Sequence, residues 1–250
     1  MKKNTIRLKN IILGDGIPKI CVPIVGRTRE EILEQAVVVA QAKPDLVEWR
    51  VDFYEQIRQE AERTETLHSL AAQLDTIPIL FTFRTSREGG NREISVGGYK
   101  ELNLWAGEQP EVQLVDVEGR WPELSASELV TGIQKNGCPV VASSHFFHQT
   151  PSHQEMQEIL LELQRTGAKI LKMAVMPQQP QEVLNLLQVT LEMDQSLPNP
   201  LITMSMGKMG GLSRVSGALT GSAVTFAAVG DCSAPGQLPL EDLRRMLELL

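Results

Sequence analysis

The chain is poor in aromatic side chains and in positive charge, and it has no long apolar run. Only 4% of its 250 residues are Phe, Trp or Tyr, and its formal net charge is -7. Proteins that bind nucleic acid usually present a basic surface and aromatic side chains on which bases stack, so this composition argues against nucleic acid as a partner. No segment approaches the roughly 18 consecutive apolar residues of a membrane span. We therefore expect a protein that binds neither nucleic acid nor a membrane.

The three cysteines, Cys21, Cys138 and Cys232, lie far apart in the sequence. An odd number of widely spaced cysteines is typical of reduced thiols in a cytosolic protein and not of a disulfide framework. The first ten residues contain lysines but lack the apolar core of a secretory signal. Both features predict a cytoplasmic protein.

Eight short apolar runs alternate with eight helical patterns along the chain. The strand-like runs cover 19–25, 45–52, 78–84, 112–118, 139–145, 168–175, 201–206 and 223–229. The helical patterns cover 30–41, 61–74, 100–106, 125–135, 154–165, 181–194, 212–219 and 240–250. The runs recur roughly every 23 to 34 residues, the spacing of a βα unit. Regular alternation of strands and helices predicts a parallel sheet.

This repeat predicts a closed (β/α)8 barrel, the TIM-barrel class of α/β fold. No Gly-x-Gly-x-x-Gly turn follows the first run, which argues against an open doubly wound sheet. Before the first unit, residues 5–13 alternate apolar and polar and meet Gly14-Asp15-Gly16. That pattern predicts an N-terminal β-hairpin over 1–17 that closes the barrel bottom. Because no linker or low-complexity stretch interrupts the repeat, we predict that 1–250 is a single domain.

A lysine stands in the middle of one apolar run. Period-two alternation along Lys169–Val175 puts Lys172 on the same face as Ile170 and Ala174. A buried ammonium without a partner is unfavourable. Two interpretations follow: either this end of the strand is solvated, or the amine is kept partly neutral for use as a nucleophile.

Alternation along the other strands places further ionisable side chains on the inward face. In a barrel, functional residues lie at the C-terminal ends of the strands. If the large apolar residues face the helices, six ionisable side chains meet in the mouth: Glu48, Arg50, Arg84, Glu118, His145 and Lys172. A structural ion-pair network inside the barrel is one explanation. A histidine and a lysine on successive strands fit acid-base and nucleophilic chemistry better.

These two residues suit carbonyl chemistry that needs no cofactor. A neutral Lys172 can condense with a ketone, and the protonated imine then acidifies the adjacent C–H bond. His145 can take that proton and return it to a leaving hydroxyl. His145 and His148 are three residues apart, but neither a His-Glu-x-x-His helix nor a cysteine pair accompanies them, so we predict no metal.

Two loops near the end of the chain are candidates for ligand binding. Residues 206–214 are glycine-rich and lead into a helix, and their backbone amides together with Arg214 predict a carboxylate or phosphate site. The last loop, 230–237, is small, polar and rich in turn residues. It would either close over a ligand or remain an ordinary surface loop.

Several short motifs of this chain, taken in their order along the sequence, resemble those of the type I 3-dehydroquinate dehydratases of the shikimate pathway. The matching segments are 48–52 (Glu-Trp-Arg-Val-Asp), 81–84 (Phe-Thr-Phe-Arg), 88–90 (Glu-Gly-Gly), 143–147 (Ser-Ser-His-Phe-Phe), 168–172 (Ala-Lys-Ile-Leu-Lys), 204–207 (Met-Ser-Met-Gly), 213–214 (Ser-Arg) and 233–237 (Ser-Ala-Pro-Gly-Gln). They cover nearly the whole chain and are specific as a set. The resemblance implies a (β/α)8 barrel, usually a homodimer, that converts 3-dehydroquinate to 3-dehydroshikimate by syn elimination without metal or cofactor.

The resemblance also implies a role for each matching residue. Lys172 is similar to the Schiff-base lysine and His145 to the general acid/base, with Glu88 orienting its imidazole. The implied substrate-binding residues are Glu48, Arg50 and Arg84 at the ring hydroxyls, Arg214, Gln237 and Ser233 at the carboxylate, and Met204, Met206 and Phe226 along an apolar wall. Two alternatives stay open: a class I aldolase that acts on a sugar phosphate, and a non-catalytic barrel that binds a small acid.

Overall fold

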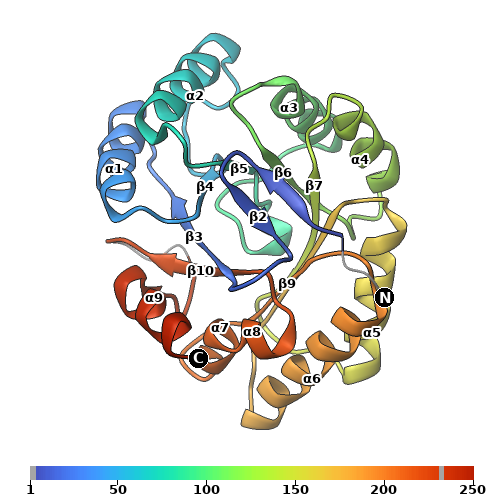
Figure 1. Ribbon diagram of the computed structural model, residues 1–250. Helices are drawn as coiled ribbons and strands as arrows, with labels where there is room; N and C mark the ends of the chain where they lie inside the picture. Colours follow the sequence, from blue (N-terminus) through green and yellow to red (C-terminus); the bar gives the residue numbers. More distant parts are fainter. Residues whose placement is uncertain (1–3, 231–233) are drawn as a thin grey trace.

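Parallel strands form a central barrel in the computed structural model, which describes residues 4–230 and 234–250 (Figure 1). The barrel strands are β3 (Lys19–Ile24), β4 (Leu46–Arg50), β5 (Ile79–Thr82), β6 (Leu114–Glu118), β7 (Val140–Phe146), β8 (Ile170–Val175), β9 (Leu201–Ser205) and β10 (Val224–Ala228). Each pairs with its neighbour from β10 through β3 to β9, and a short strand β11 (Leu238–Pro239) joins β10. The ring closes where the amide of Ala223 donates to the carbonyl of Leu201 at 2.7 Å. The predicted (β/α)8 barrel is confirmed.

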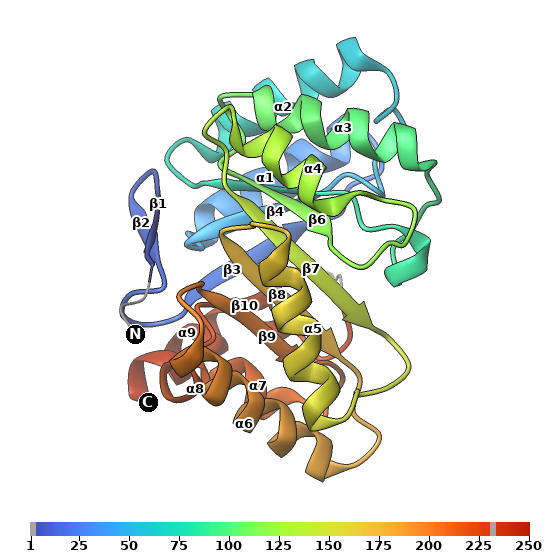
Figure 2. The same cartoon turned by 90° about the vertical axis from the view of Figure 1, so that its right-hand side faces the viewer.

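Helices surround the barrel (Figures 1 and 2). They are α1 (Arg29–Ala42), α2 (Glu60–Leu74), α3 (Val96–Glu108), α4 (Ala126–Gln134), α5 (His153–Arg165), α6 (Pro180–Ser196), α7 (Gly211–Val215), α8 (Gly217–Thr220) and α9 (Leu240–Leu249). The single helix predicted over 212–219 is wrong, because α7 and α8 separate at Ser216. Gly217 packs so tightly that a β-carbon there would lie 2.6 Å from the carbonyl oxygen of Ser222, which fixes the path of the chain at this break.

The N-terminal hairpin is present, but its turn lies earlier than predicted. Strands β1 (Ile6–Leu8) and β2 (Ile11–Leu13) pair in antiparallel register around a two-residue loop, so 5–13 is not one strand leading to the glycines at 14 and 16. Lys9 lies in this loop and has a positive backbone φ of 45°. Its Nζ donates to the carbonyls of Asp75 at 2.9 Å and Ile77 at 3.2 Å. A lysine thus takes a turn position at which Gly or Asn is commoner.

The hairpin covers the N-terminal ends of the barrel strands (Figure 2). Its side chains Leu8 and Leu13 belong to the same buried cluster as Leu46, Leu80 and Leu114, which point into the barrel. Apolar side chains therefore fill the lower barrel. In the part of the chain that the structure describes, no helix is long and apolar enough to span a membrane.

Alternation along each strand divides apolar from ionisable side chains as predicted. Val47, Trp49 and Val51 are buried among residues of the surrounding helices. Glu48 and Arg50, which alternate with them, are buried on the inward face at 4% and 9% exposure. The upper, C-terminal end of the barrel interior is consequently polar and charged, above an apolar floor.

Candidate active site

A cavity of about 50 Å³ lies at the C-terminal ends of the barrel strands. It is lined by Glu48, Arg50, Arg84, His145, Phe147, Lys172, Ala174, Met204, Met206, Arg214, Phe226, Ala234 and Gln237. Every predicted site residue is in this lining except Glu88, Glu118 and Ser233. Glu88 lies directly behind His145, and Ser233 is outside the described residues. Three lining residues were not predicted as site residues: Phe147, Ala174 and Ala234.

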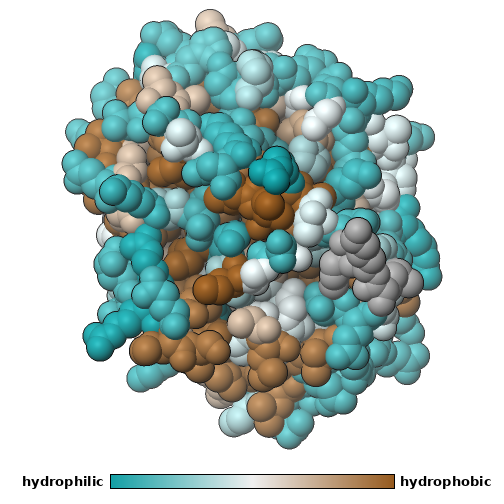
Figure 3. Space-filling model, in the orientation of Figure 1, coloured by the Kyte–Doolittle hydropathy of each residue, from teal (hydrophilic) through white to brown (hydrophobic). Residues whose placement is uncertain are grey.

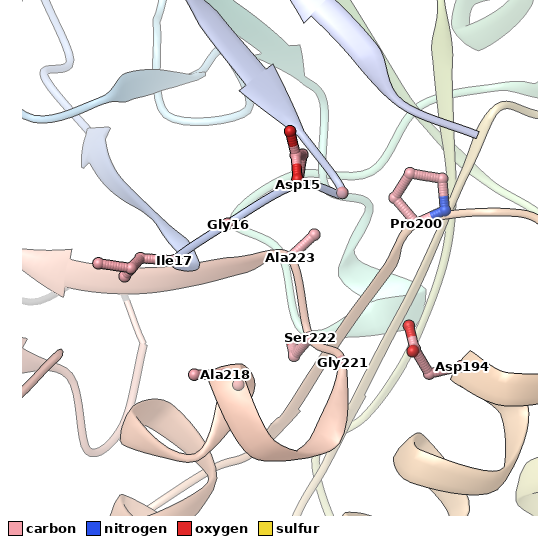
Figure 4. Close-up of a pocket in the computed structure, with 11 residues that line it drawn as sticks. Asp15, Gly16, Ile17, Asp194, Pro200, Ala218, Gly221, Ser222 and Ala223 are labelled. Atoms are coloured by element: carbon pink, nitrogen blue, oxygen red, sulfur yellow. The ribbon is translucent and has the colours of Figure 1, made fainter. Parts of the chain in front are cut away.

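A second hollow, of about 120 Å³, lies at the opposite end of the barrel (Figure 4). It is formed between the connector after the hairpin, at Asp15 and Gly16, and the turn before β10, at Gly221 and Ser222. The described residues that line it include two carboxylates, Asp15 and Asp194, but no amine, imidazole or guanidinium. The mouth is therefore the better candidate site, although its cavity is smaller.

Lys172 projects from β8 into the mouth cavity and is 4% exposed. Its Nζ lies 3.4 Å from Oε1 of Glu48 and 3.5 Å from Oδ2 of Asp116. The amine is also 4.6 Å from the centre of the Phe226 ring. Carboxylates and the face of an aromatic ring both attract a cation, so this lysine has the partners that burial requires. The strand end at Lys172 is therefore not solvated, which excludes one of the two interpretations drawn from the sequence.

His145 lies on the neighbouring strand β7, where it pairs in register with Ala174. Its Nδ1 lies 2.8 Å from Oε2 of Glu88. Burial, with Arg84, Lys172 and Arg50 nearby, lowers the pKa of His145 well below 6.5. The imidazole is therefore neutral near neutral pH, and its second nitrogen, Nε2, can accept a proton.

Glu88 sits on a single 3-10 turn, Ser86–Glu88, that follows β5. Burial raises the pKa of Glu88 to about 8; Arg84 opposes this shift, and the nearby carboxylates of Glu118 and Asp116 add to it. Glu88 and His145 are joined by a hydrogen bond, so protonation of one side chain affects protonation of the other. The pair therefore titrates as a unit.

Arg84 is the centre of the charge network behind the cavity. Its guanidinium contacts Asp116 at 2.7 Å, Glu118 at 3.1 Å and Glu88 at 3.3 Å. It also donates to the hydroxyl of Ser143 at 3.0 Å. Burial alone would raise the pKa of Asp116, but Arg84, Lys172 and the Ser143 hydroxyl hold it below its usual value. Asp116 is thus an anion at neutral pH that links the arginine to the lysine.

Asp116 is a functional residue that was not predicted from the sequence. Alternation along β6 does put Asp116 on the inward face together with Glu118. Asp116 lies one layer deeper, level with Thr82 and Val141 of the neighbouring strands. Glu118 lies at the end of the strand, where functional residues are expected, but it is buried behind Arg84 and does not line the cavity.

The glycine-rich turn contributes a guanidinium but not the expected set of amides. Arg214 is 2% exposed and donates to the carbonyls of Phe226 at 3.2 Å and Pro235 at 3.0 Å. The amides that were predicted to bind an anion donate instead to backbone carbonyls; they belong to Gly207, Gly210 and Gly211. The glycines therefore shape the chain, and the side chains of 206–214 that line the cavity are Met206 and Arg214.

The raised pKa of Glu88 predicts a pH-dependent stability. Glu88 titrates at about 8 in the folded protein and near 4.5 when unfolded, so the folded state alone holds this proton between those values. The free energy of unfolding should therefore fall as pH rises towards 8, by at most about 1.4 kcal/mol per pH unit. Above pH 6.5 the lowered pKa of His145 adds little, because histidine is then mostly neutral in both states.

Urea unfolding between pH 6.5 and 8 would measure this effect. Glu88→Gln should remove the decline, whereas Glu123→Gln, at an exposed loop position, should keep it. Equal pH slopes in the unmodified protein and in Glu88→Gln would contradict the raised pKa.

Comparisons with known proteins show the family of this chain. The family model for type I 3-dehydroquinase matches residues 20–250. The 3-dehydroquinate dehydratase of Klebsiella pneumoniae is 43% identical over 248 residues, which cover 99% of each chain. A type I 3-dehydroquinate dehydratase from Clostridium difficile, solved with covalently modified comenic acid, gives a TM-score of 0.94 at 40% identity over 99% of this chain and 98% of that one. The enzyme from Geobacillus kaustophilus gives 0.96 at 37% identity, covering 100% and 97%. This chain belongs to the type I 3-dehydroquinase family.

Proposed function

We propose that this protein converts 3-dehydroquinate to 3-dehydroshikimate in the shikimate pathway, through a Schiff base on Lys172 with His145 as general acid/base. The named relatives support the reaction. One observation supports the mechanism: a buried amine and a neutral imidazole project from adjacent strands into the same cavity. Simple binding of an acid would leave the histidine and glutamate pair without a role. An aldolase that acts on a sugar phosphate would need the amides of the glycine-rich turn for the phosphate, and these amides donate to backbone carbonyls instead.

In this proposal Lys172 first loses a proton, for which the carboxylates of Glu48 and Asp116 are the nearest acceptors. The amine adds to the substrate ketone, the carboxylate returns its proton, and the ketone oxygen leaves as water, giving a protonated imine. His145 removes a proton from the carbon next to the imine. The electron pair of that C–H bond forms the new C=C bond and the π pair of the C=N bond moves to nitrogen, giving an enamine. The enamine expels the hydroxyl on the following carbon, which leaves as water with the proton from His145. Hydrolysis of the imine then releases the product.

Because one imidazole both takes and returns the proton, both bonds break on the same face of the ring. Glu88 would hold this imidazole through Nδ1, which leaves Nε2 directed at the substrate. The proposed binding residues are Glu48, Arg50 and Arg84 for the hydroxyls, Arg214 and Gln237 for the carboxylate, and Met204, Met206 and Phe226 for the ring. Ser233 is proposed from the family resemblance alone. Every step uses side chains of this chain, so the proposal needs no metal or cofactor.

An absorbance assay for the enone product tests the proposed reaction. The purified protein should produce 3-dehydroshikimate from 3-dehydroquinate without an added cofactor. No absorbance rise would contradict the proposed reaction.

Arg214→Ala should raise KM for 3-dehydroquinate about 10- to 100-fold, the usual effect of losing a charge-assisted hydrogen bond. Arg244→Ala is a matched control, because Arg244 also donates to two backbone carbonyls, those of Ala42 and Lys43, but lies at the barrel bottom. This control should leave KM unchanged. A similar KM in both variants would argue against carboxylate binding by Arg214.

We also propose that 1–250 acts as a single domain, in the cytoplasm and as a homodimer. Apolar side chains gather along the lower edge of the surface in Figure 3, over α8 and α9. Leu219 of α8 and Leu249 of α9 are each 78% exposed. A subunit contact usually covers a surface of this kind. Sedimentation equilibrium would test the dimer, since a mass of one chain would contradict it.

A further inference from the structure

We propose that Asp52 is a positioning residue that connects Arg50 to the segment carrying Glu88. The inference rests on the proposed function, in which Arg50 binds substrate and Glu88 orients His145. Asp52 follows β4 and is fully buried, at 0% exposure. It does not line the cavity, so it would act only through the residues that it holds.

On one side, Asp52 fixes the guanidinium of Arg50. Oδ1 accepts from Nε at 2.8 Å, and Oδ2 accepts from a terminal nitrogen at 2.9 Å. Two parallel bonds between a carboxylate and a guanidinium set both the position and the plane of the fork. Arg50 also lies 5.1 Å from the centre of the Phe53 ring. The side chain that faces the cavity is thus held in one orientation from behind.

On the other side, the same carboxylate holds both ends of the segment 84–91. Oδ1 accepts from the amide of Arg84 at 3.3 Å, and Oδ2 accepts from the amide of Asn91 at 3.0 Å. The carbonyl of Asp52 accepts from Nδ2 of Asn91 at 3.2 Å. Glu88 lies between these two anchor points. A shift of the segment would therefore move Glu88 away from the imidazole of His145.

Four N–H groups donate to the two side-chain oxygens of Asp52, and a carboxylate is needed to accept all four bonds. An asparagine has the same size, but its amide group offers one oxygen and adds an N–H donor that would face other donors. The segment would not unfold in such a variant, because Glu118 holds it independently at Thr85, by the amide at 2.8 Å and the hydroxyl at 2.7 Å. We expect a displaced Arg50 and Glu88 in an otherwise folded barrel.

The test compares Asp52→Asn with Asp45→Asn. Asp45 precedes the same strand at the barrel bottom, where its carboxylate accepts from the amide of Ile20 at 2.7 Å. Asp52→Asn should lower kcat/KM about 10- to 30-fold, with a raised KM from the loss of Arg50 alignment. The acid limb of the kcat/KM profile should move to lower pH, because the imidazolium of His145 loses its acceptor. Asp45→Asn should keep both KM and the pH profile.

Two measurements separate this proposal from the proposed function. Borohydride should still trap 3-dehydroquinate on Lys172 in Asp52→Asn, whereas failure to trap it in the unmodified protein would count against the Schiff base and not against Asp52. The 15N signals of the His145 imidazole, followed against pH without substrate, should shift in Asp52→Asn and not in Asp45→Asn. Unchanged His145 signals and KM in Asp52→Asn would overturn the proposal, as would equal losses in the two variants.

Asn91→Ala keeps the proposal testable if Asp52→Asn does not fold. It removes the bond from Nδ2 to the Asp52 carbonyl and leaves the Arg50 fork intact. We expect the acid limb of the kcat/KM profile to move to lower pH, with little change in KM. A change in KM without a pH shift would contradict the connection to Glu88.

Discussion

Lys172→Met should reduce turnover of 3-dehydroquinate by at least about 10⁴-fold, the scale on which loss of a covalent nucleophile acts in enzymes. Methionine has a similar length and suits the neighbouring Met204 and Phe226, but it cannot form an imine. Steady-state measurement of the enone product would give the effect. Because Glu48 and Asp116 lose their shared cation, the variant should also be less stable by about 3 to 5 kcal/mol, so its folding must be checked by circular dichroism.

Lys169→Met is the matched control for this experiment. Lys169 lies three residues earlier, immediately before the same strand, and is exposed. Its replacement should leave turnover unchanged. Turnover in Lys172→Met within about tenfold of the unmodified protein would exclude Lys172 as an essential nucleophile.

His145→Ala should slow turnover about 10²- to 10⁴-fold, the usual contribution of a general acid/base. The variant keeps the amine that forms the imine, so the Schiff base should still form. It should then accumulate, because proton removal is slow. Borohydride trapping followed by mass spectrometry would show this uncoupling of imine formation from elimination.

His148→Ala is the control for His145→Ala, since His148 is exposed and lies only three residues further along the chain. We expect normal turnover in this variant. Near-normal turnover in His145→Ala, or an equal loss in both variants, would refute the acid/base role.

The barrel was predictable from the sequence because its signals are local. Each strand shows as an apolar run, and a side chain at every second position must face inward. Counting along β4 and β8 was enough to place Glu48 and Lys172 in one interior. The helix starts depend on equally local contacts: the side chain of Thr28 caps α1, and Ser152 with Glu155 forms a capping box at α5.

Other features could not be read from the sequence because they depend on pairings between distant segments. The hairpin turn falls at Lys9 because its amine reaches carbonyls some 66 residues away, at Asp75. Asp116 gains its role from Arg84 on another strand, and Asp52 gains its role from a loop that returns to it at Asn91. Alternation gives the face on which a side chain lies, but not its depth or its partner.

One measurement tests the central claim most directly. The protein is incubated with 3-dehydroquinate and borohydride, its mass is determined, and the modified peptide is sequenced. The proposed mechanism predicts a single reduced adduct of the ligand on Lys172, present in the unmodified protein and in His145→Ala and absent from Lys172→Met. An unmodified mass under turnover conditions, or an adduct on a different lysine, would contradict it.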